Sequence, residues 1–382
     1  MDRSILFVTG MPRCGTTLLD KLLSAHAEFS VLSQPFPFLF IEAKRAFLRT
    51  LGKVHAEYPL ENLFAETGYT AEGFTRYLTQ YRLNRDLILS LFAAMRDFSG
   101  QYTRFEDANV KAVVDRFLAE DFASTLANLY EKLTDKCEAQ WFGGKETMCE
   151  EFLPYLLEQG WKCIVIIRDP RDMMASLNHG WGQNYSGSLK PTLFSLRHWR
   201  KSIAFVLHLR NHPGFFWLRY EDLVTQTIQS LNKFTDELGV VPFTKDFFDQ
   251  GIKDQKGNAW LSNSSHSPST RINRWSIEKY KSTLAPEVVS YIEACCYPEL
   301  RYLNYPLSLK WSETAEAIRG FEEPYELRRE TLQSHYLDPI RKEEELKRIE
   351  LLSTTGQAQR EYFIFGDVVD LLRGAIPNEA GL

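Results

Sequence analysis

Short apolar runs alternate along the chain with stretches whose apolar positions recur every three or four residues. Residues 5–8 form the first run, and residues 16–25 follow with leucines spaced along one helical face. This alternation predicts parallel strands joined by helices, that is, a doubly wound α/β sheet of about five strands. The strand-like runs are residues 5–8, 29–32, 140–142, 163–167 and 215–218.

The domain organisation follows from the same pattern. Residues 163–167 and 215–218 are continuous and apolar, as expected of central parallel strands covered by helices on both faces. We predict one α/β domain over residues 1–310. Within it, residues 36–138 have helical periodicity and few strand signals, which predicts a helical insertion that caps the ligand edge of the sheet.

The composition changes after residue 310. Residues 341–352 read as a charged amphipathic helix, and residues 362–372 as a short apolar segment. Residues 311–382 are therefore predicted to form a helical extension, which serves either as a brace or as a contact in a homodimer.

Charge and cysteine usage exclude several classes of protein. The net charge of −5 argues against nucleic acid or an anionic membrane as a partner. The apolar runs are far shorter than the about 20 residues that cross a bilayer, and the chain starts without a leader pattern, which predicts a cytoplasmic protein. The six cysteines form no C-x-x-C pair, so we expect reduced thiols in the core and no metal site.

A glycine-rich segment lies between the first strand-like run and the first helix. It reads Gly10-Met-Pro-Arg-Cys-Gly-Thr-Thr17. Backbone N–H groups of such a loop and the N-terminus of the next helix bind anions, so the segment predicts a phosphate site. A nucleotide kinase carries lysine where this chain has Thr16, and the loop's cation is Arg13. The loop therefore lacks the lysine that bridges β- and γ-phosphates.

A second candidate anion site follows the fourth strand-like run. Arg168 comes directly after this run, and Ser176 lies further along the helix that Pro170 begins. A guanidinium and a hydroxyl at the carboxyl edge of a sheet suit a terminal phosphate. Residues 162–210 are rich in Lys and Arg and predict a basic stripe. The alternative is a solvated helix face on which Arg171 pairs with Asp172.

These segments resemble, in order and spacing over residues 5–310, the motifs of sulfotransferases that use 3′-phosphoadenosine-5′-phosphosulfate (PAPS). Residues 12–17 resemble the loop for the 5′-phosphosulfate, and Arg168 with Ser176 resembles the pair for the 3′-phosphate. Tyr220 resembles a tyrosine beside the adenine, and residues 272–275, followed by residues 284–287, resemble a segment that closes over the nucleotide. By this resemblance the nucleotide-binding residues are Pro12, Arg13, Cys14, Gly15, Thr16, Thr17, Arg168, Ser176, Tyr220, Arg271 and Arg274.

The resemblance implies a P-loop-like α/β fold and sulfuryl transfer from PAPS, with PAP as the product and no metal. Arg13 and Lys145 are then expected to stabilise the charge that develops on the leaving oxygen. The family's usual general-base positions hold Gln34 and Thr147, which accept no proton at neutral pH. The nearby candidates for the base are Glu42, Glu146, Glu150 and His179.

Two other functions fit part of the pattern. A P-loop small-molecule kinase needs a lysine at position 16 and carboxylates for magnesium, and a PAP-binding module keeps the nucleotide site without catalysis. We favour a PAPS-dependent sulfotransferase acting on a hydroxyl, amino or amide group of a small molecule, such as a natural product or a sugar. The aromatic residues of the insertion either line the acceptor site or pack in the core.

Overall fold

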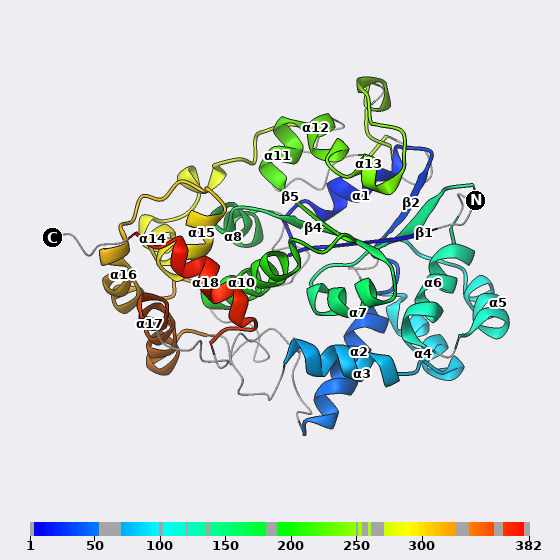
Figure 1. The fold of residues 1–382 in the computed structure, drawn as a ribbon, viewed down its shortest axis with the longest axis horizontal. Coiled ribbons are helices and arrows are strands. Elements are labelled where there is room, and N and C mark those ends of the chain that lie inside the picture. Colours follow the sequence, from blue (N-terminus) through cyan, green and yellow to red (C-terminus); the bar gives the residue numbers. More distant parts are fainter. Residues whose placement is uncertain are drawn as a thin grey trace. The chain divides into compact units, whose positions relative to one another are not determined.

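Five parallel strands form one sheet in the order β2-β3-β1-β4-β5 (Figure 1). They are β1 (Ser4–Thr9), β2 (Phe29–Ser33), β3 (Trp141–Lys145), β4 (Lys162–Ile167) and β5 (Phe215–Arg219). The predicted doubly wound α/β fold is confirmed. The computed structural model describes residues 4–52, 70–98, 102–119, 121–134, 138–180, 189–249, 251–253, 259–260, 271–325, 336–354 and 362–377.

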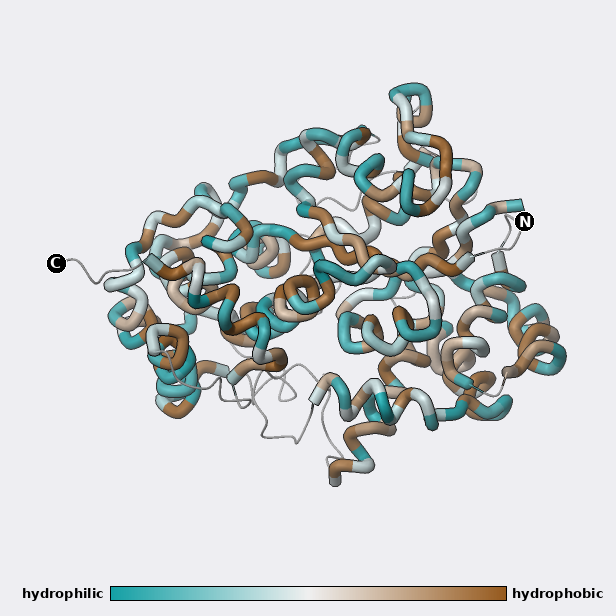
Figure 2. The backbone as a smooth tube through the Cα atoms, in the orientation of Figure 1, coloured by the Kyte–Doolittle hydropathy of each residue, from teal (hydrophilic) through white to brown (hydrophobic). Residues whose placement is uncertain are grey.

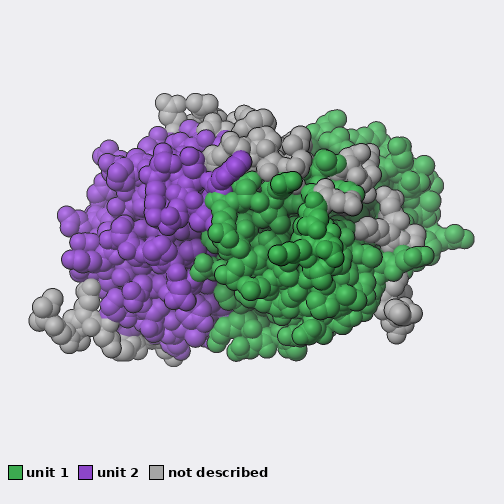
Figure 3. All heavy atoms as spheres, turned by 90° about the horizontal axis from the view of Figure 1, so that it is seen from above, with its two compact units in different colours: residues 1–60, 69–167, 209–274 green, residues 61–68, 168–208, 275–382 purple. Residues whose placement is uncertain are grey.

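The described chain forms two compact units, which Figure 3 shows in different colours. Unit 1 comprises residues 1–60, 69–167 and 209–274 and contains the whole sheet. Its helices are α1 (Thr16–Ser24), α2 (Pro37–Thr50), α3 (Ala71–Gln80), α4 (Arg85–Met95), α5 (Asp107–Phe117), α6 (Phe122–Lys132), η2 (Glu150–Phe152), α7 (Leu153–Glu158), α11 (Tyr220–Thr225), α12 (Thr227–Asn232), α13 (Thr235–Leu238) and η3 (Lys245–Phe247).

The strand order makes β1 the point where the direction of winding reverses. β1 lies between β3 and β4, with Val8 opposite Lys145 and Thr9 opposite Val165. In open α/β sheets, ligands bind outside the carboxyl ends of the strands at such a switch point. The loop after β1 and the end of β3 therefore meet where a ligand is expected.

Successive side chains of β1 point to opposite faces of the sheet, and those of Leu6, Phe7 and Val8 are buried. Leu6 and Val8 belong to a core that α1 and α11 to α13 cover. Phe7 points to the opposite face, where its ring stacks on Phe40 of α2 at 5.4 Å and lies 6.4 Å from the ring of Trp161. Figure 2 shows the brown, hydrophobic stretches that result along the strands. Helices on both faces shield β1 from water, as is typical of a parallel sheet.

The insertion is helical in its described residues, from α2 to α6. Phe36, Phe40 and Phe74 are buried, which favours core packing over an acceptor site for these three rings. The aromatic residues at positions 58, 64 and 69 lie outside the described residues.

The prediction that residues 215–218 form a central strand is wrong. β5 is the edge strand beside β4, and its middle residues Phe216 and Trp217 are only half-buried. Phe215 and Leu218 are buried, and the ring of Phe216 packs on that of Phe234 with centroids 5.6 Å apart.

Unit 2 comprises residues 61–68, 168–208 and 275–382 and is helical in its described residues. Its helix α17 (Pro339–Ser353) carries both charged and apolar residues, which alternate as teal and brown in Figure 2. No helix among the described residues is long and apolar enough to cross a membrane. The helices are α8 (Pro170–Asn178), most of α10 (Thr192–Leu209), η4 (Lys279–Ser282), α14 (Pro286–Cys295), α15 (Tyr297–Tyr302), η5 (Trp311–Glu313), α16 (Thr314–Gly320), α17 (Pro339–Ser353) and α18 (Gly366–Gly374).

The prediction of reduced, buried thiols is confirmed for the cysteines that the structure describes. Five described cysteines are buried and form no disulfide with one another: Cys14, Cys149, Cys163, Cys295 and Cys296. Cys137 lies outside the described residues.

Candidate active site

The loop between β1 and α1 contains two glycines at positions where a side chain would not fit. Gly15 has a φ of +96°, and a Cβ there would lie 2.4 Å from Cδ2 of Tyr220. Gly10 has a φ of +152°, and its Cβ would lie 2.5 Å from the carbonyl oxygen of Ile166. Only glycine fits both positions, and a main chain without side chains is what a phosphate can approach closely.

The N-terminus of α1 supplies donors for an anion. Gly15 is the N-cap, and no described side chain caps this helix, so its first-turn N–H groups have no partner within it. Arg13 is half-buried with a left-handed φ of 68°. Cys14 is buried, and its N–H donates to the carbonyl oxygen of Met11 at 3.1 Å, which closes the turn. The loop therefore combines free helix donors with one cation.

The structure brings Tyr220 to this loop. Tyr220 begins α11, and its ring lies against Gly15. Arg274 is exposed and its Nη2 donates to the carbonyl oxygen of Thr225, near the end of the same helix, at 3.0 Å. Arg271 is exposed. Tyr220 and Arg274, which are distant from the loop in sequence, thus both contact or belong to one short helix of unit 1, and Tyr220 also meets the loop.

Lys145, the last residue of β3, lies beside the loop. Its side chain is 0% exposed, and its Nζ lies 3.3 Å from Oγ1 of Thr17 and 3.2 Å from Oε1 of Gln34. Burial lowers the pKa of Lys145 below its ordinary value, although neighbouring carboxylates oppose this effect. Gln34, at the position of the family's base, therefore serves as an acceptor for the lysine.

Three further residues belong to this cluster and were missed by sequence reasoning. Asp20 of α1 lies 3.8 Å from Nζ of Lys145, and Oγ of Ser33 donates to the same carboxylate at 2.6 Å. The ring of Tyr102 covers the ammonium at 5.0 Å from its centroid. One signal could have identified Asp20: it lies three residues after Thr17, on the same face of the helix.

Two of the four candidate bases are buried. Glu146 accepts a hydrogen bond at 2.6 Å from the backbone N–H of Phe36, and burial raises the pKa of Glu146 to about 8. Glu150 is fully buried in η2. Neither carboxylate is exposed to an acceptor molecule in this structure.

The other two candidates reach the surface of their units. Oε1 of Glu42 accepts from Nη2 of Arg49 at 2.5 Å, so an ion pair holds this carboxylate. His179 follows α8, is exposed, and shares a hydrogen bond of 2.9 Å with the hydroxyl of Tyr325. Partial burial lowers the pKa of His179 below 6.5, so its imidazole is neutral at pH 7 and able to accept a proton.

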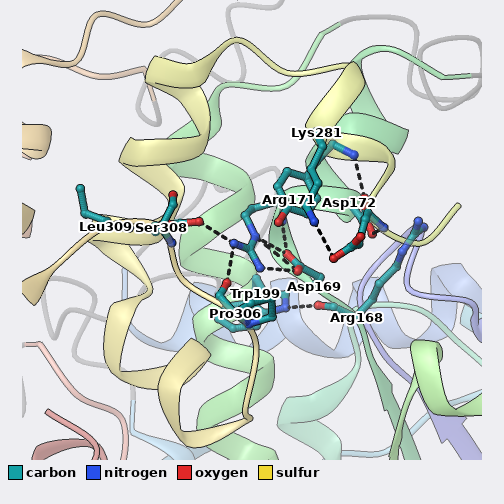
Figure 4. Close-up of polar contacts among 12 residues, drawn as sticks. Arg168, Asp169, Arg171, Asp172, Trp199, Lys281, Pro306, Ser308 and Leu309 are labelled. Atoms are coloured by element: carbon teal, nitrogen blue, oxygen red, sulfur yellow. Dashed lines mark hydrogen bonds and ion pairs between the residues drawn. The ribbon is translucent and has the colours of Figure 1, made fainter. Parts of the chain in front are cut away.

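Arg168 and Ser176 are held in buried positions of unit 2. Nη2 of Arg168 donates to the carbonyl oxygen of Ser276 at 2.6 Å, and its own carbonyl accepts from Nε1 of Trp199 at 2.8 Å (Figure 4). Contacts at both the guanidinium and the main chain fix this arginine directly after β4.

The alternative in which Arg171 pairs with Asp172 on a solvated face is wrong. Arg171 is buried, and its guanidinium forms ion pairs with Asp169 at 2.7 Å (Figure 4) and with Glu293 at 2.5 Å. Asp172 instead accepts two backbone N–H groups, at 2.7 and 2.9 Å. Arg171 is therefore a structural residue whose charge is neutralised inside unit 2.

The predicted basic stripe is also wrong for the residues of α10. Arg197 and Arg200 are buried, and both pair with Glu345 of α17. Arg197 additionally pairs with Glu344 at 2.7 Å. Carboxylates from the C-terminal extension neutralise these arginines, so they present no basic surface.

A glycine-containing loop at the switch point of a parallel sheet is typical of α/β proteins that bind phosphate groups. A sequence model described as "Sulfotransferase family" matches residues 6–245. The chain belongs to the sulfotransferase family, and it is an enzyme of this class.

Solved sulfotransferase structures are similar to the chain at low sequence identity. The sulfotransferase domain from the curacin biosynthetic pathway is 18% identical with a TM-score of 0.41, and the match covers 80% of this chain and 99% of that one. The sulfotransferase domain from the Synechococcus PCC 7002 olefin synthase is 18% identical with a TM-score of 0.42, covering 75% and 90%. Mouse sulfotransferase SULT7A1 complexed with PAP is 12% identical with a TM-score of 0.37, covering 84% and 91%. No curated protein matches the chain in sequence.

Proposed function

We propose that this sulfotransferase transfers a sulfuryl group from PAPS to a hydroxyl or nitrogen of a small-molecule acceptor, such as a natural product or a sugar. One observation carries the proposal. The phosphate loop has Thr16 at the kinase lysine position, whereas Lys145 reaches the loop from β3 and lies 3.3 Å from Oγ1 of Thr17. A P-loop kinase carries this ammonium within the loop itself, so a lysine supplied by β3 distinguishes the site from that of a kinase.

The residues present fit PAPS. The bare backbone at Gly15 leaves room for the 5′-phosphosulfate, and the N-terminus of α1 offers N–H donors to it. Tyr220 lies against this glycine and is proposed to face the adenine. Arg168 and Ser176 are proposed to bind the 3′-phosphate, which a guanidinium holds through charge-assisted hydrogen bonds.

PAPS supplies an activated sulfuryl group. The acceptor atom forms a bond to sulfur, the bond from sulfur to the 5′-phosphate oxygen breaks, and PAP leaves with that electron pair. Arg13 and Lys145 are proposed to stabilise the charge on the departing oxygen, which is worth most in the transition state. The sulfuryl group carries less charge than a γ-phosphate, so the proposed mechanism uses these two cations and no metal.

The acceptor's proton needs a base that a bound molecule can reach. Glu146 and Glu150 are buried, and Glu42 is paired with Arg49. We therefore assign the proton to His179, which is exposed and whose lowered pKa leaves it neutral at pH 7.

Ligand-dependent melting tests the nucleotide. PAP without metal should raise the melting temperature by a few degrees, since a ligand at about a hundred times its Kd adds about 2.7 kcal/mol of stability. ATP with magnesium should not. Stabilisation by ATP with magnesium and not by PAP would favour a kinase and overturn the proposal.

Turnover tests the reaction. Labelled PAPS incubated with a panel of sugars, phenols, alcohols and amines should give a labelled product with at least one acceptor. Binding of PAP without turnover of any acceptor would instead indicate a PAP-binding module.

A further inference from the structure

Three charged side chains are buried together beside the phosphate loop. Asp20 and Lys145 are 0% exposed and Lys21 is 6% exposed. Nζ of Lys21 lies 3.3 Å from one carboxylate oxygen of Asp20, and Nζ of Lys145 lies 3.8 Å from the other. Buried charges cost several kcal/mol each unless they are paired, so one carboxylate compensates two ammonium groups here.

Asp20 is fixed in this position from two sides. It belongs to α1, three residues after Thr17, which also contacts Lys145. Oγ of Ser33, the last residue of β2, donates to its carboxylate at 2.6 Å. The helix that starts at the phosphate loop thus also carries the anion that faces the lysine.

The other groups around the ammonium of Lys145 do not replace this anion. Thr17 and Gln34 offer neutral oxygens at 3.3 and 3.2 Å, and Tyr102 offers the face of its ring. Glu146 follows Lys145 in the chain, but burial raises the pKa of Glu146 to about 8, which leaves it largely protonated at neutral pH.

We propose that Asp20 is a positioning residue of the transfer step: its carboxylate, fixed by Ser33, keeps the ammonium of Lys145 charged beside the phosphate loop. This inference rests on the proposed function. Only an ammonium donates a charged hydrogen bond to the departing oxygen, and burial alone favours the neutral amine. Without Asp20, Lys145 is expected to lose its proton at a lower pH.

The key variant is Asp20→Asn, which keeps the size of the side chain and an oxygen for Ser33 but removes the charge. The alkaline limb of the kcat profile should move down by about one pH unit, because an opposite charge at this distance shifts a pKa by about one to three units. The Kd for PAP at pH 6.5 should stay within a few-fold of wild type.

Lys21→Gln is the matched control, because it removes the cation that competes for Asp20. Its alkaline limb should stay in place or move up, whereas damage to the fold would move both variants in the same direction. Ser33→Ala should shift the limb in the direction of Asp20→Asn, by less, and replaces that variant if it does not fold. An unchanged limb in both Asp20→Asn and Ser33→Ala would overturn the proposal.

A measurement without PAPS separates this inference from the proposed function. The pKa of Lys145 can be followed by NMR on protein with 13C-labelled lysine, with Lys145→Arg identifying the signal. Asp20→Asn should lower this pKa even if no acceptor is sulfated. A pKa equal to that of wild type refutes the role of Asp20, and a lowered pKa with no turnover refutes only the proposed function.

Discussion

Glu345 is an anion buried among arginines, and its replacement by glutamine tests how unit 2 holds its C-terminal helix. The carboxylate is 1% exposed and accepts hydrogen bonds from Arg200 at 2.5 and 3.0 Å and from Nε of Arg197 at 3.1 Å. The Glu345→Gln variant keeps the shape of the side chain but removes the carboxylate shared by two buried guanidinium groups, of which Arg197 keeps its ion pair with Glu344.

The expected loss of stability can be calculated from the shifted pKa of Glu345. Burial acts to raise the pKa of Glu345, but Arg200 and Arg197 outweigh it and hold the pKa at about 2, against an ordinary value of 4.5. A difference of about 2.5 units at about 1.4 kcal/mol per unit gives about 3 kcal/mol. Removing one partner of a buried ion pair costs about 3–5 kcal/mol, which agrees.

The sign of the pH dependence is fixed by the lowered pKa. The contribution of Glu345 is fully present above pH 4.5 and is lost as the pH falls toward 2. Wild-type unit 2 should therefore lose stability over this window, and Glu345→Gln should lose less over the same window, because the titrating group has been removed.

Denaturant unfolding at pH 7, followed by circular dichroism, measures the effect. Glu345→Gln should lower the free energy of unfolding of unit 2 by about 3 kcal/mol. Glu350→Gln on the same helix removes an exposed partner of Lys347 and should cost less than about 0.5 kcal/mol. Equal unfolding curves for the two variants would show that the buried arginines are stabilised without Glu345.

Three further predictions concern the enzyme. Lys145→Ala should lower kcat strongly and leave the Kd for PAP within a few-fold in calorimetry, since its contact matters most in the transition state. Arg168→Ala should weaken PAP binding about ten- to a hundredfold, whereas Arg171→Ala should mainly lower the melting temperature; equal losses of affinity would contradict these roles. His179→Ala should lower kcat about a hundredfold or more and abolish the acidic limb of its pH profile; an unchanged limb would exclude His179 as the base.

The strand–loop–helix unit could be predicted from the sequence because its determinants are local. The apolar run of β1, the glycines of the loop and the leucines of α1 lie within residues 4–24, and each agrees with the others. The end of β3 could not be predicted as strand, because Gly143 and Gly144 carry no β-propensity. Their conformation is set by pairing with β1 and β2, which only the assembled sheet provides.

Acidic residues far along the chain determine whether an arginine of unit 2 is exposed or buried in an ion pair. Arg171 meets Glu293, and Arg200 meets Glu345, at separations of 122 and 145 residues. No local sequence pattern predicts an ion pair between such distant residues. The run of arginines therefore predicts a basic stripe, whereas in the folded unit these charges are buried and neutralised. Sequence spacing predicts which residues share a helix, but it does not predict which charged residue of another helix packs against them.

Charged residues that stabilise the fold differ from those that can bind a ligand in being matched by a fixed opposite charge. Arg200 is matched by a fixed carboxylate at short distance, so it has no charge to offer a ligand. Around the phosphate loop, Asp20 faces both Lys21 and Lys145, and Arg13 adds a further cation from the loop itself. This excess of positive charge beside free helix donors favours an anion in that place. The buried cluster with unequal charges, and not the abundance of arginine, is therefore the feature that distinguishes the candidate active site.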